Sequence, residues 1–142
     1  METPNLVKMM KSPFADNDTA LLCSEPATTE YRGETYLYTS YWYQCQKSGE
    51  CFTTNESDAL CTAQVYEQYR LRHHIPTVEE IVALRKQCKF SAAKMSALLG
   101  IGINQYRLYE AGEMPSLSIG RILYALCHNP ETLKFYLKIK DF

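Results

Sequence analysis

The chain has 142 residues and a formal net charge of −1, a length that fits one ordinary domain or two small ones. Its apolar runs are too short for a transmembrane helix, and its first residues lack the apolar segment of a secretory signal, so we expect a cytoplasmic protein without a membrane partner. Residues 1–76 hold 6 Lys and Arg against 10 Asp and Glu, whereas residues 77–142 hold 9 against 6. An acidic first half and a mildly basic second half hint at two partners of opposite charge.

The first twenty residues are polar, with scattered Pro and Asp, and are expected to form a flexible arm over 1–20. The segment "TTEYRGETYLYTSYWYQCQKSGECFTT" then brings many Tyr and Thr residues, which favour strands, with turn signals at "RGE" and "KSGE". This pattern predicts antiparallel strands over 28–32, 34–44 and 50–53.

Tyrosines in this segment do not keep one parity along the predicted central strand, because the spacing shifts between Tyr38 and Tyr41. We therefore expect a bulge or a register change near Ser40. Basic residues are not interleaved with the rings, so a small sheet with a tyrosine core is favoured over a surface that stacks RNA bases.

A helix is predicted over 56–72, opened by a capping box of Thr53 and Glu56 and ended before Pro76. Adjacent His73 and His74 have no cysteine at ligand spacing, and they are expected to belong to the linker that follows this helix.

Five further helices are predicted in the last 65 or so residues. They comprise 78–88 with a capping box of Thr77 and Glu80, a helix from Ser91 stopped by Gly100, a helix stopped by Gly112, a helix capped by Ser116, and a last helix opened by Asn129 and Pro130. The predicted class is α+β, with a β-rich domain and connecting helix over 21–75 and a helical domain over 76–142.

Two short helices separated by a Gly-containing turn, "SAAKMSALLGIGINQYRLYEAG", match a helix-turn-helix. Ala92 and Ala93 are small enough for close helix crossing, and Gly100 and Gly102 permit the turn. Ile103 is expected to pack the turn onto the core.

Asn104, Gln105 and Arg107 then stand at the start of the second helix, the end that enters the major groove in this motif. Asn and Gln side chains pair with adenine and Arg pairs with guanine, so these residues are candidate base contacts. Ser91 and Lys94, at the start of the first helix, are candidate phosphate contacts. A helical bundle that binds no nucleic acid remains the alternative.

At these residues the chain resembles a known family. "LRKQCKFSAAKMSALLGIGINQYRLYEAGEMPSLSIGRILYAL" resembles the Xre/Cro-type repressor domain, and its "G-x-N…YE-x-G…PS" form is similar to the C-terminal half of MqsA/YgiT-type antitoxins. The resemblance covers about residues 10–138. It implies a five-helix Xre/Cro-like domain that reads DNA with Asn104; the family's Arg four residues on is Leu108 here, with Arg107 one residue off.

The family's N-terminal half carries two zinc knuckles, "M-K-C-P-x-C" and "Y-x-C-x-x-C-G-E". "MKSPFA" and "YQCQKSGE" stand at those places here, so the four zinc positions hold Ser12, Ala15, Cys45 and Ser48. A structural zinc site needs four ligands, which a single thiolate does not supply. We therefore expect no metal and no cofactor, with the tyrosine-rich sheet and Phe14 holding this part together.

The remaining cysteines are expected to be free thiols, because cytoplasm is reducing. Cys88 and Cys127 fall in helical patterns, where a free thiol behaves as a small buried hydrophobe. Cys23, Cys51 and Cys61 could join Cys45 in a site, but their spacings fit no usual knuckle pair.

The resemblance implies a sequence-specific transcriptional repressor: the antitoxin of a type II toxin–antitoxin pair, binding a small basic toxin through its N-terminal domain and an operator as a homodimer. Leu133, Tyr136 and Leu137 in the last helix are a candidate dimer seam or the end of the core. A stand-alone repressor of a mobile element and a protein-interaction module without a toxin remain alternatives. No catalytic triad or phosphate-binding loop is found, so an enzyme is not expected.

Overall fold

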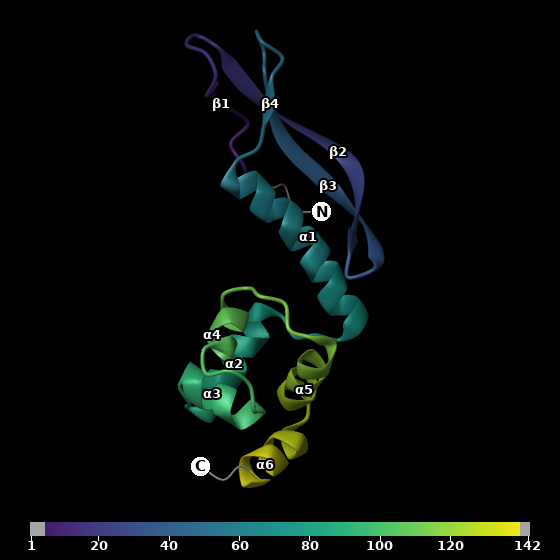
Figure 1. The fold of residues 1–142 in the computed structure, drawn as a ribbon, viewed down its shortest axis with the longest axis vertical. Coiled ribbons are helices and arrows are strands. Elements are labelled where there is room, and N and C mark those ends of the chain that lie inside the picture. The colour runs from purple at the N-terminus through teal and green to yellow at the C-terminus, as the bar shows by residue number, and fades with distance from the viewer. Residues whose placement is uncertain (1–4, 140–142) are drawn as a thin grey trace. The chain divides into compact units, whose positions relative to one another are not determined.

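The computed structural model describes residues 5–139 and divides into two compact units, residues 1–68 (unit 1) and residues 69–142 (unit 2). Over the described residues a four-stranded antiparallel sheet is followed by six helices, which confirms the α+β class (Figure 1). The elements are β1 Met9–Lys11, β2 Thr19–Tyr31, β3 Glu34–Cys45, β4 Cys51–Phe52, α1 Asn55–His73, α2 Val78–Cys88, α3 Ala92–Leu99, α4 Gln105–Glu110, α5 Leu117–His128 and α6 Pro130–Ile139. No helix within residues 5–139 has the length and apolar character needed to cross a bilayer.

The sheet is built around one long hairpin of β2 and β3, with strand order β1-β2-β3-β4. Its register runs without interruption from Ala20 opposite Cys45 to Tyr31 opposite Glu34, and Ser40 lies opposite Glu25. The bulge expected near Ser40 is therefore wrong. Successive side chains alternate between the faces of a strand, so the shift in tyrosine spacing puts aromatic rings on both faces of a regular ribbon.

The first twenty residues differ from the expected arm in their described part. β1 and the start of β2 lie in this range, and Met9, Met10 and Lys11 pair with Leu21, Ala20 and Thr19. Burial of apolar side chains explains why these residues join the sheet. Ala20 is fully buried with Tyr43 and Cys45, and Met10 packs against this cluster. The sequence pattern missed this strand because three residues are too few to show a period.

Helix α1 holds the outer edge of β3 through side-chain amides. Gln64 accepts a hydrogen bond from the Thr39 N–H at 2.9 Å and donates one to the Thr39 carbonyl at 2.9 Å, while Gln68 donates to the Leu37 carbonyl at 2.9 Å. The glutamines thus replace a neighbouring strand, and this edge is not left as a template for association.

The start of α1 agrees with the predicted range to within one residue, but the cap differs. Thr54 and Ser57 form the reciprocal pair: the Thr54 N–H donates to Ser57 Oγ at 2.9 Å and the Ser57 N–H donates to Thr54 Oγ1 at 3.1 Å. The expected box of Thr53 and Glu56 is therefore wrong by one position. In the observed pair, the Ser57 hydroxyl takes the place of the glutamate carboxylate that the capping-box pattern expects.

Unit 2 consists of the end of α1 and helices α2 to α6, and the predicted starts of α2, α3, α5 and α6 are confirmed by their caps. Thr77 and Glu80 form the expected capping box, and Ser91 and Ser116 accept hydrogen bonds from the third residue of α3 and α5. Asn129 Oδ1 accepts from the first turn of α6. The buried core comprises Ile81, Leu84, Met95, Leu98, Tyr106, Tyr109, Leu123, Leu126 and Leu133.

All six cysteines are free thiols, as expected. Cys88 and Cys127 are half-buried and pack against the core of unit 2 rather than lying fully inside it. Burial raises the pKa of Cys127 to about 11, so this thiol stays protonated at neutral pH.

A close approach of the linker to α5 leads to a first prediction. A Cβ added at Gly120 would lie 2.8 Å from Ile75 Cγ1. We expect Gly120→Ala to lower the free energy of unfolding by about 1–2 kcal/mol, because overpacking outweighs the roughly 1 kcal/mol gained in helix propensity. Urea denaturation measures this change. Gly102→Ala is the control, since open space surrounds that position; an equal loss in both variants would contradict the explanation.

Candidate functional site

The candidate nucleic-acid interface is formed by α3, the turn after it and α4. Gly100 ends α3 in the left-handed conformation at φ 70°, which glycine adopts without strain. Ser96, fully buried in α3, accepts a hydrogen bond from the Tyr106 N–H at 3.1 Å. Tyr106 lies in the first turn of α4, where backbone N–H groups lack intrahelical acceptors. The Ser96 hydroxyl therefore joins the two helices, and it is a residue that the sequence pattern missed.

Two expectations about the packing of this motif are wrong. Ile103 is 70% exposed instead of packing the turn onto the core, and Ile101 packs there in its place. Ala92 packs against the core as expected, but Ala93 is exposed. The turn has two isoleucines two residues apart, and only the folded backbone decides which of them points inward.

One side of α4 is fixed in the core by tyrosines. Tyr106 is fully buried, and its hydroxyl donates a hydrogen bond to the Ile81 carbonyl at 2.5 Å. Burial raises the pKa of the Tyr106 phenol far above its usual value, so it remains a neutral donor. Tyr109 is buried as well. Because these two rings fix the rotation of α4, the opposite side of the helix must face solvent.

Asn104 and Arg107 lie on the exposed side of α4. Asn104 occupies the N-cap position, with φ −95° and ψ −2°, but its side chain makes no capping hydrogen bond. Its amide is therefore not used by the helix. An exposed amide and a guanidinium at the start of a short helix are the groups that pair with adenine and guanine in the major groove.

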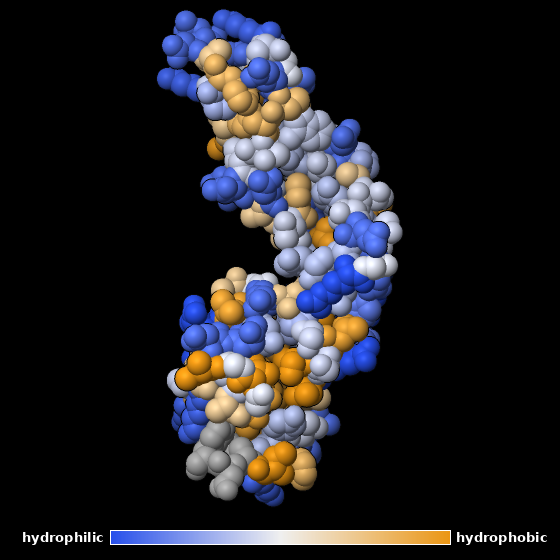
Figure 2. Space-filling model, in the orientation of Figure 1, coloured by the Kyte–Doolittle hydropathy of each residue, from blue (hydrophilic) through white to orange (hydrophobic). Residues whose placement is uncertain are grey.

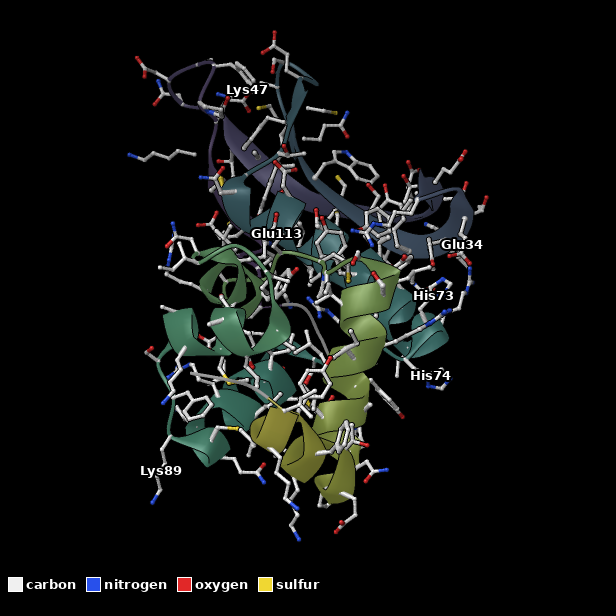
Figure 3. All side chains as sticks on the ribbon, turned by 60° about the horizontal axis from the view of Figure 1, so that its bottom comes forward. Glu34, Lys47, His73, His74, Lys89 and Glu113 are labelled. Atoms are coloured by element: carbon white, nitrogen blue, oxygen red, sulfur yellow. The ribbon has the colours of Figure 1, made fainter. Side chains whose placement is uncertain are left out.

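Gln105 has a different environment from the one expected. Its Nε2 donates a hydrogen bond to Glu113 Oε2 at 2.6 Å. Glu113 follows α4 in the loop to α5 (Figure 3). A contact from this nitrogen to a base would require the loss of the Glu113 interaction, so Gln105 is a weaker candidate than Asn104. The sequence carries no signal for this pairing, since the two residues belong to different elements.

The two candidate phosphate contacts are exposed at the start of α3. Ser91 Oγ accepts the hydrogen bond of the Lys94 N–H at 3.1 Å and so acts as the helix cap. Lys94 Nζ lies 4.4 Å from the centre of the Phe90 ring. Glu110 on α4 is paired with Arg85 at 2.6 Å, which offsets its negative charge.

The difference in net charge between the two units is larger than the difference between the two halves of the sequence. Unit 1 holds 4 Lys and Arg against 10 Asp and Glu, giving −6, and unit 2 holds 11 against 6, giving +5. A positive unit attracts phosphate backbones, whereas a negative unit attracts basic partners.

In unit 1, the four positions that the resemblance compares with zinc ligands are Ser12, Ala15, Cys45 and Ser48. Cys45 Sγ donates a hydrogen bond to Ser12 Oγ at 3.0 Å, so two of the four positions meet. Within residues 5–139, however, no group of three metal-binding side chains occurs. One thiol with a serine hydroxyl is not a zinc donor set.

Hydrogen bonds and rings hold this end of the sheet together. Asp18 is buried, and its carboxylate accepts hydrogen bonds from the N–H of Lys47 at 2.9 Å and of Ser48 at 3.3 Å, in the turn marked by Lys47 in Figure 3. Phe14 is 53% exposed, and its ring packs edge-on against that of Phe52 with 5.8 Å between the ring centres. Asp18 is a structural residue that the sequence analysis missed.

Asp18 leads to a prediction about pH. Its hydrogen bonds to the backbone, the Lys47 N–H first, lower the pKa of its carboxyl below the usual 3.8. A depressed pKa contributes stability above the unfolded-state value, and that stability is lost as the pH falls through the folded-state value. We expect Asp18→Asn to lower the thermal midpoint of unit 1 at neutral pH, and the difference from the parent to shrink below about pH 4. Asp16→Asn, at an exposed carboxylate, is the control; a difference that persists unchanged in acid would contradict the charge-based explanation.

Unit 1 also contains an open groove of about 290 Å³ between the hairpin and α1. Three tyrosines line it together with one carboxylate and one thiol: Tyr31, Tyr38, Tyr66, Glu30 and Cys61. Tyr31 and Tyr66 lie 5.1 Å apart between ring centres. Aromatic faces beside a carboxylate suit a cationic side chain.

The three α6 residues offered as a dimer seam or as the end of the core all contact the core of unit 2. Leu133 is buried, and Tyr136 and Leu137 pack against the core of unit 2. Phe135 and Ile139 are the exposed apolar residues of this helix, at 62% and 57%.

No protein-family model matches the chain, and comparison with curated proteins finds no match either. Function is therefore inferred from this chain's own residues.

Proposed function

We propose that the protein is a sequence-specific DNA-binding repressor whose α3–turn–α4 segment reads the major groove. The observation that carries this proposal is the exposed Asn104 amide, which is unused by its helix and stands beside exposed Arg107. Tyr106 and Tyr109 orient α4 from the buried side. The positive charge of unit 2 supports association with phosphates.

In this proposal Asn104 pairs with an adenine and Arg107 contacts a guanine or a phosphate. Lys94 and the N-terminus of α3 contact the backbone of the duplex. Gln105 supports the loop after α4 through Glu113 rather than reading a base itself. A helix-turn-helix repressor binds as a dimer at two half-sites about one helical turn apart, so we propose a homodimer with a palindromic operator.

Fluorescence anisotropy with the DNA upstream of the protein's own gene tests this proposal. The full chain is titrated into labelled upstream duplex and into a scrambled duplex of the same composition, at two salt concentrations. We expect tighter binding to the upstream duplex, and affinity for both should fall with salt at a log–log slope of about −0.9 per phosphate neutralised. Equal affinity for both duplexes at both salt concentrations would exclude autorepression through this region.

We also propose that the protein acts as an antitoxin, with unit 1 binding a small basic toxin. The charge of −6 on unit 1 and its tyrosine-lined groove with Glu30 support a basic partner. Co-expression with any small basic open reading frame beside the gene, followed by co-purification and growth measurement, tests this role. Toxicity relieved by the full chain supports it, whereas the absence of such a frame favours a stand-alone repressor.

A further inference from the structure

The turn before α4 and the exposed side of α4 each carry one large apolar side chain that the core of unit 2 does not use. Ile103 is 70% exposed and Leu108 is 36% exposed. Figure 2 shows apolar side chains among polar ones on the surface of this unit. Tyr106 and Tyr109 already complete the buried side of the helix, so packing alone does not require apolar residues at positions 103 and 108.

These two residues are interleaved with the candidate base contacts. The Leu108 N–H donates to the Asn104 carbonyl at 3.3 Å, so the two residues stand one helical turn apart, and side chains at this spacing share one face. Ile103 immediately precedes Asn104 in the turn. The Asn104 amide and the Leu108 side chain therefore share one face of α4, and Ile103 stands next to Asn104 in the turn before the helix.

In the major groove, the 5-methyl group of thymine is the apolar feature that distinguishes one base edge from the others. A leucine or isoleucine side chain cannot donate a hydrogen bond to a base or to a phosphate. It increases the affinity for DNA only by burying its own apolar surface against another apolar group, away from water. An Asn that pairs with adenine lies near the thymine of the same base pair, whose 5-methyl group is exposed in the major groove.

We propose that Leu108 and Ile103 read thymine 5-methyl groups next to the adenine bound by Asn104, so that each half-site contains an A·T-rich core. This assignment rests on the proposed DNA binding, and it names the base pairs that the protein would prefer. Where a basic residue at position 108 would read guanine, Leu108 instead selects against G·C by favouring the methyl group.

Deoxyuridine substitution tests this assignment, because deoxyuridine keeps every hydrogen-bonding group of thymidine and lacks only the methyl. A duplex is first selected from a randomised library with the full chain, and each thymidine is then replaced singly. We expect a loss of affinity of roughly threefold to fivefold at one or two positions in each half-site. Replacement at the other positions should change affinity little.

Two pairs of variants assign the effect to particular residues. Leu108→Ala should bind the parent and deoxyuridine duplexes equally at one of the sensitive positions, whereas Leu117→Ala, at the same 36% exposure on α5, should keep the difference. Ile103→Ala and Ile139→Ala form a second pair, at 70% and 57% exposure. Far-ultraviolet circular dichroism checks that each variant is folded.

The outcomes separate this inference from the proposed function. A selected duplex that binds tightly but tolerates deoxyuridine at every position overturns methyl readout and leaves DNA binding intact. Discrimination that survives in both Leu108→Ala and Ile103→Ala overturns the assignment to these residues. Failure to enrich any duplex over the starting library overturns DNA binding itself, and methyl readout with it.

Discussion

Replacing Asn104 with alanine is expected to cost about 1–3 kcal/mol of specific binding free energy, roughly a fivefold to 150-fold loss of affinity, while binding to scrambled DNA changes little. The reason is that the Asn104 amide is exposed, is not used as a helix cap and stands at the end of α4 that we propose enters the groove. In the proposed complex the substitution removes two hydrogen bonds to adenine and no charge. Stability should be unaffected, because no capping bond disappears with the side chain.

Anisotropy titration of Asn104→Ala on the selected and scrambled duplexes measures this effect. Arg107→Ala is the informative comparison, since it removes a positive charge, which in the proposed complex attracts DNA of any sequence. We expect Arg107→Ala to weaken binding to both duplexes and to reduce the salt slope by about 1 if Arg107 contacts a phosphate. A loss in Asn104→Ala that is equal on both duplexes would show that this residue does not read a base.

Replacing Ser96 with alanine is the second large expected effect, and it acts through structure. The Tyr106 N–H is buried in the first turn of α4, and the Ser96 hydroxyl is its acceptor at 3.1 Å. Alanine would leave this donor without a partner in a site closed to water. We expect the free energy of unfolding to fall by about 1–3 kcal/mol, because the desolvation cost of an unpaired buried N–H is then uncompensated.

Urea denaturation of Ser96→Ala measures the loss, and DNA affinity should fall with it because the same bond orients α4 on α3. Ser118→Ala is the matched control: its hydroxyl is exposed on α5 and lies 3.2 Å from that of Ser116. We expect a change within about 0.5 kcal/mol for this surface position. If the two variants were equally stable, the link between α3 and α4 would have to lie elsewhere.

Local signals along the chain were sufficient to predict most helices of unit 2. Thr77 with Glu80, Ser91, Ser116 and Asn129 each cap the helix that they were expected to cap. A cap depends on three or four consecutive residues, so its pattern is complete in the sequence. The α+β class follows from the same local patterns, because strand-forming tyrosines and helix signals occupy separate parts of the chain.

The ends of the strands and the pairing between them were harder to predict. β1 is only three residues long, and the expected bulge near Ser40 is absent from the regular pairing of β2 with β3. Pairing depends on residues that are far apart in sequence, and both faces of the ribbon accept aromatic rings, so alternation alone gives no unique register. The hydrogen bond between Cys45 and Ser12 was equally hard to predict, because the two residues lie 33 positions apart in the sequence.

At the candidate interface, the sequence by itself determined the residue types: a turn with glycines, an Asn at the start of α4 and an Arg close behind it. Only the tertiary structure decided which of these side chains are available. It places Ile101 inward and Ile103 outward, holds Gln105 on Glu113 and leaves the Asn104 amide unused by the helix. The physical reason is that the rotation of α4 is set by the burial of Tyr106 and Tyr109 and by the Ser96 hydrogen bond, and these depend on packing between elements rather than on any local pattern.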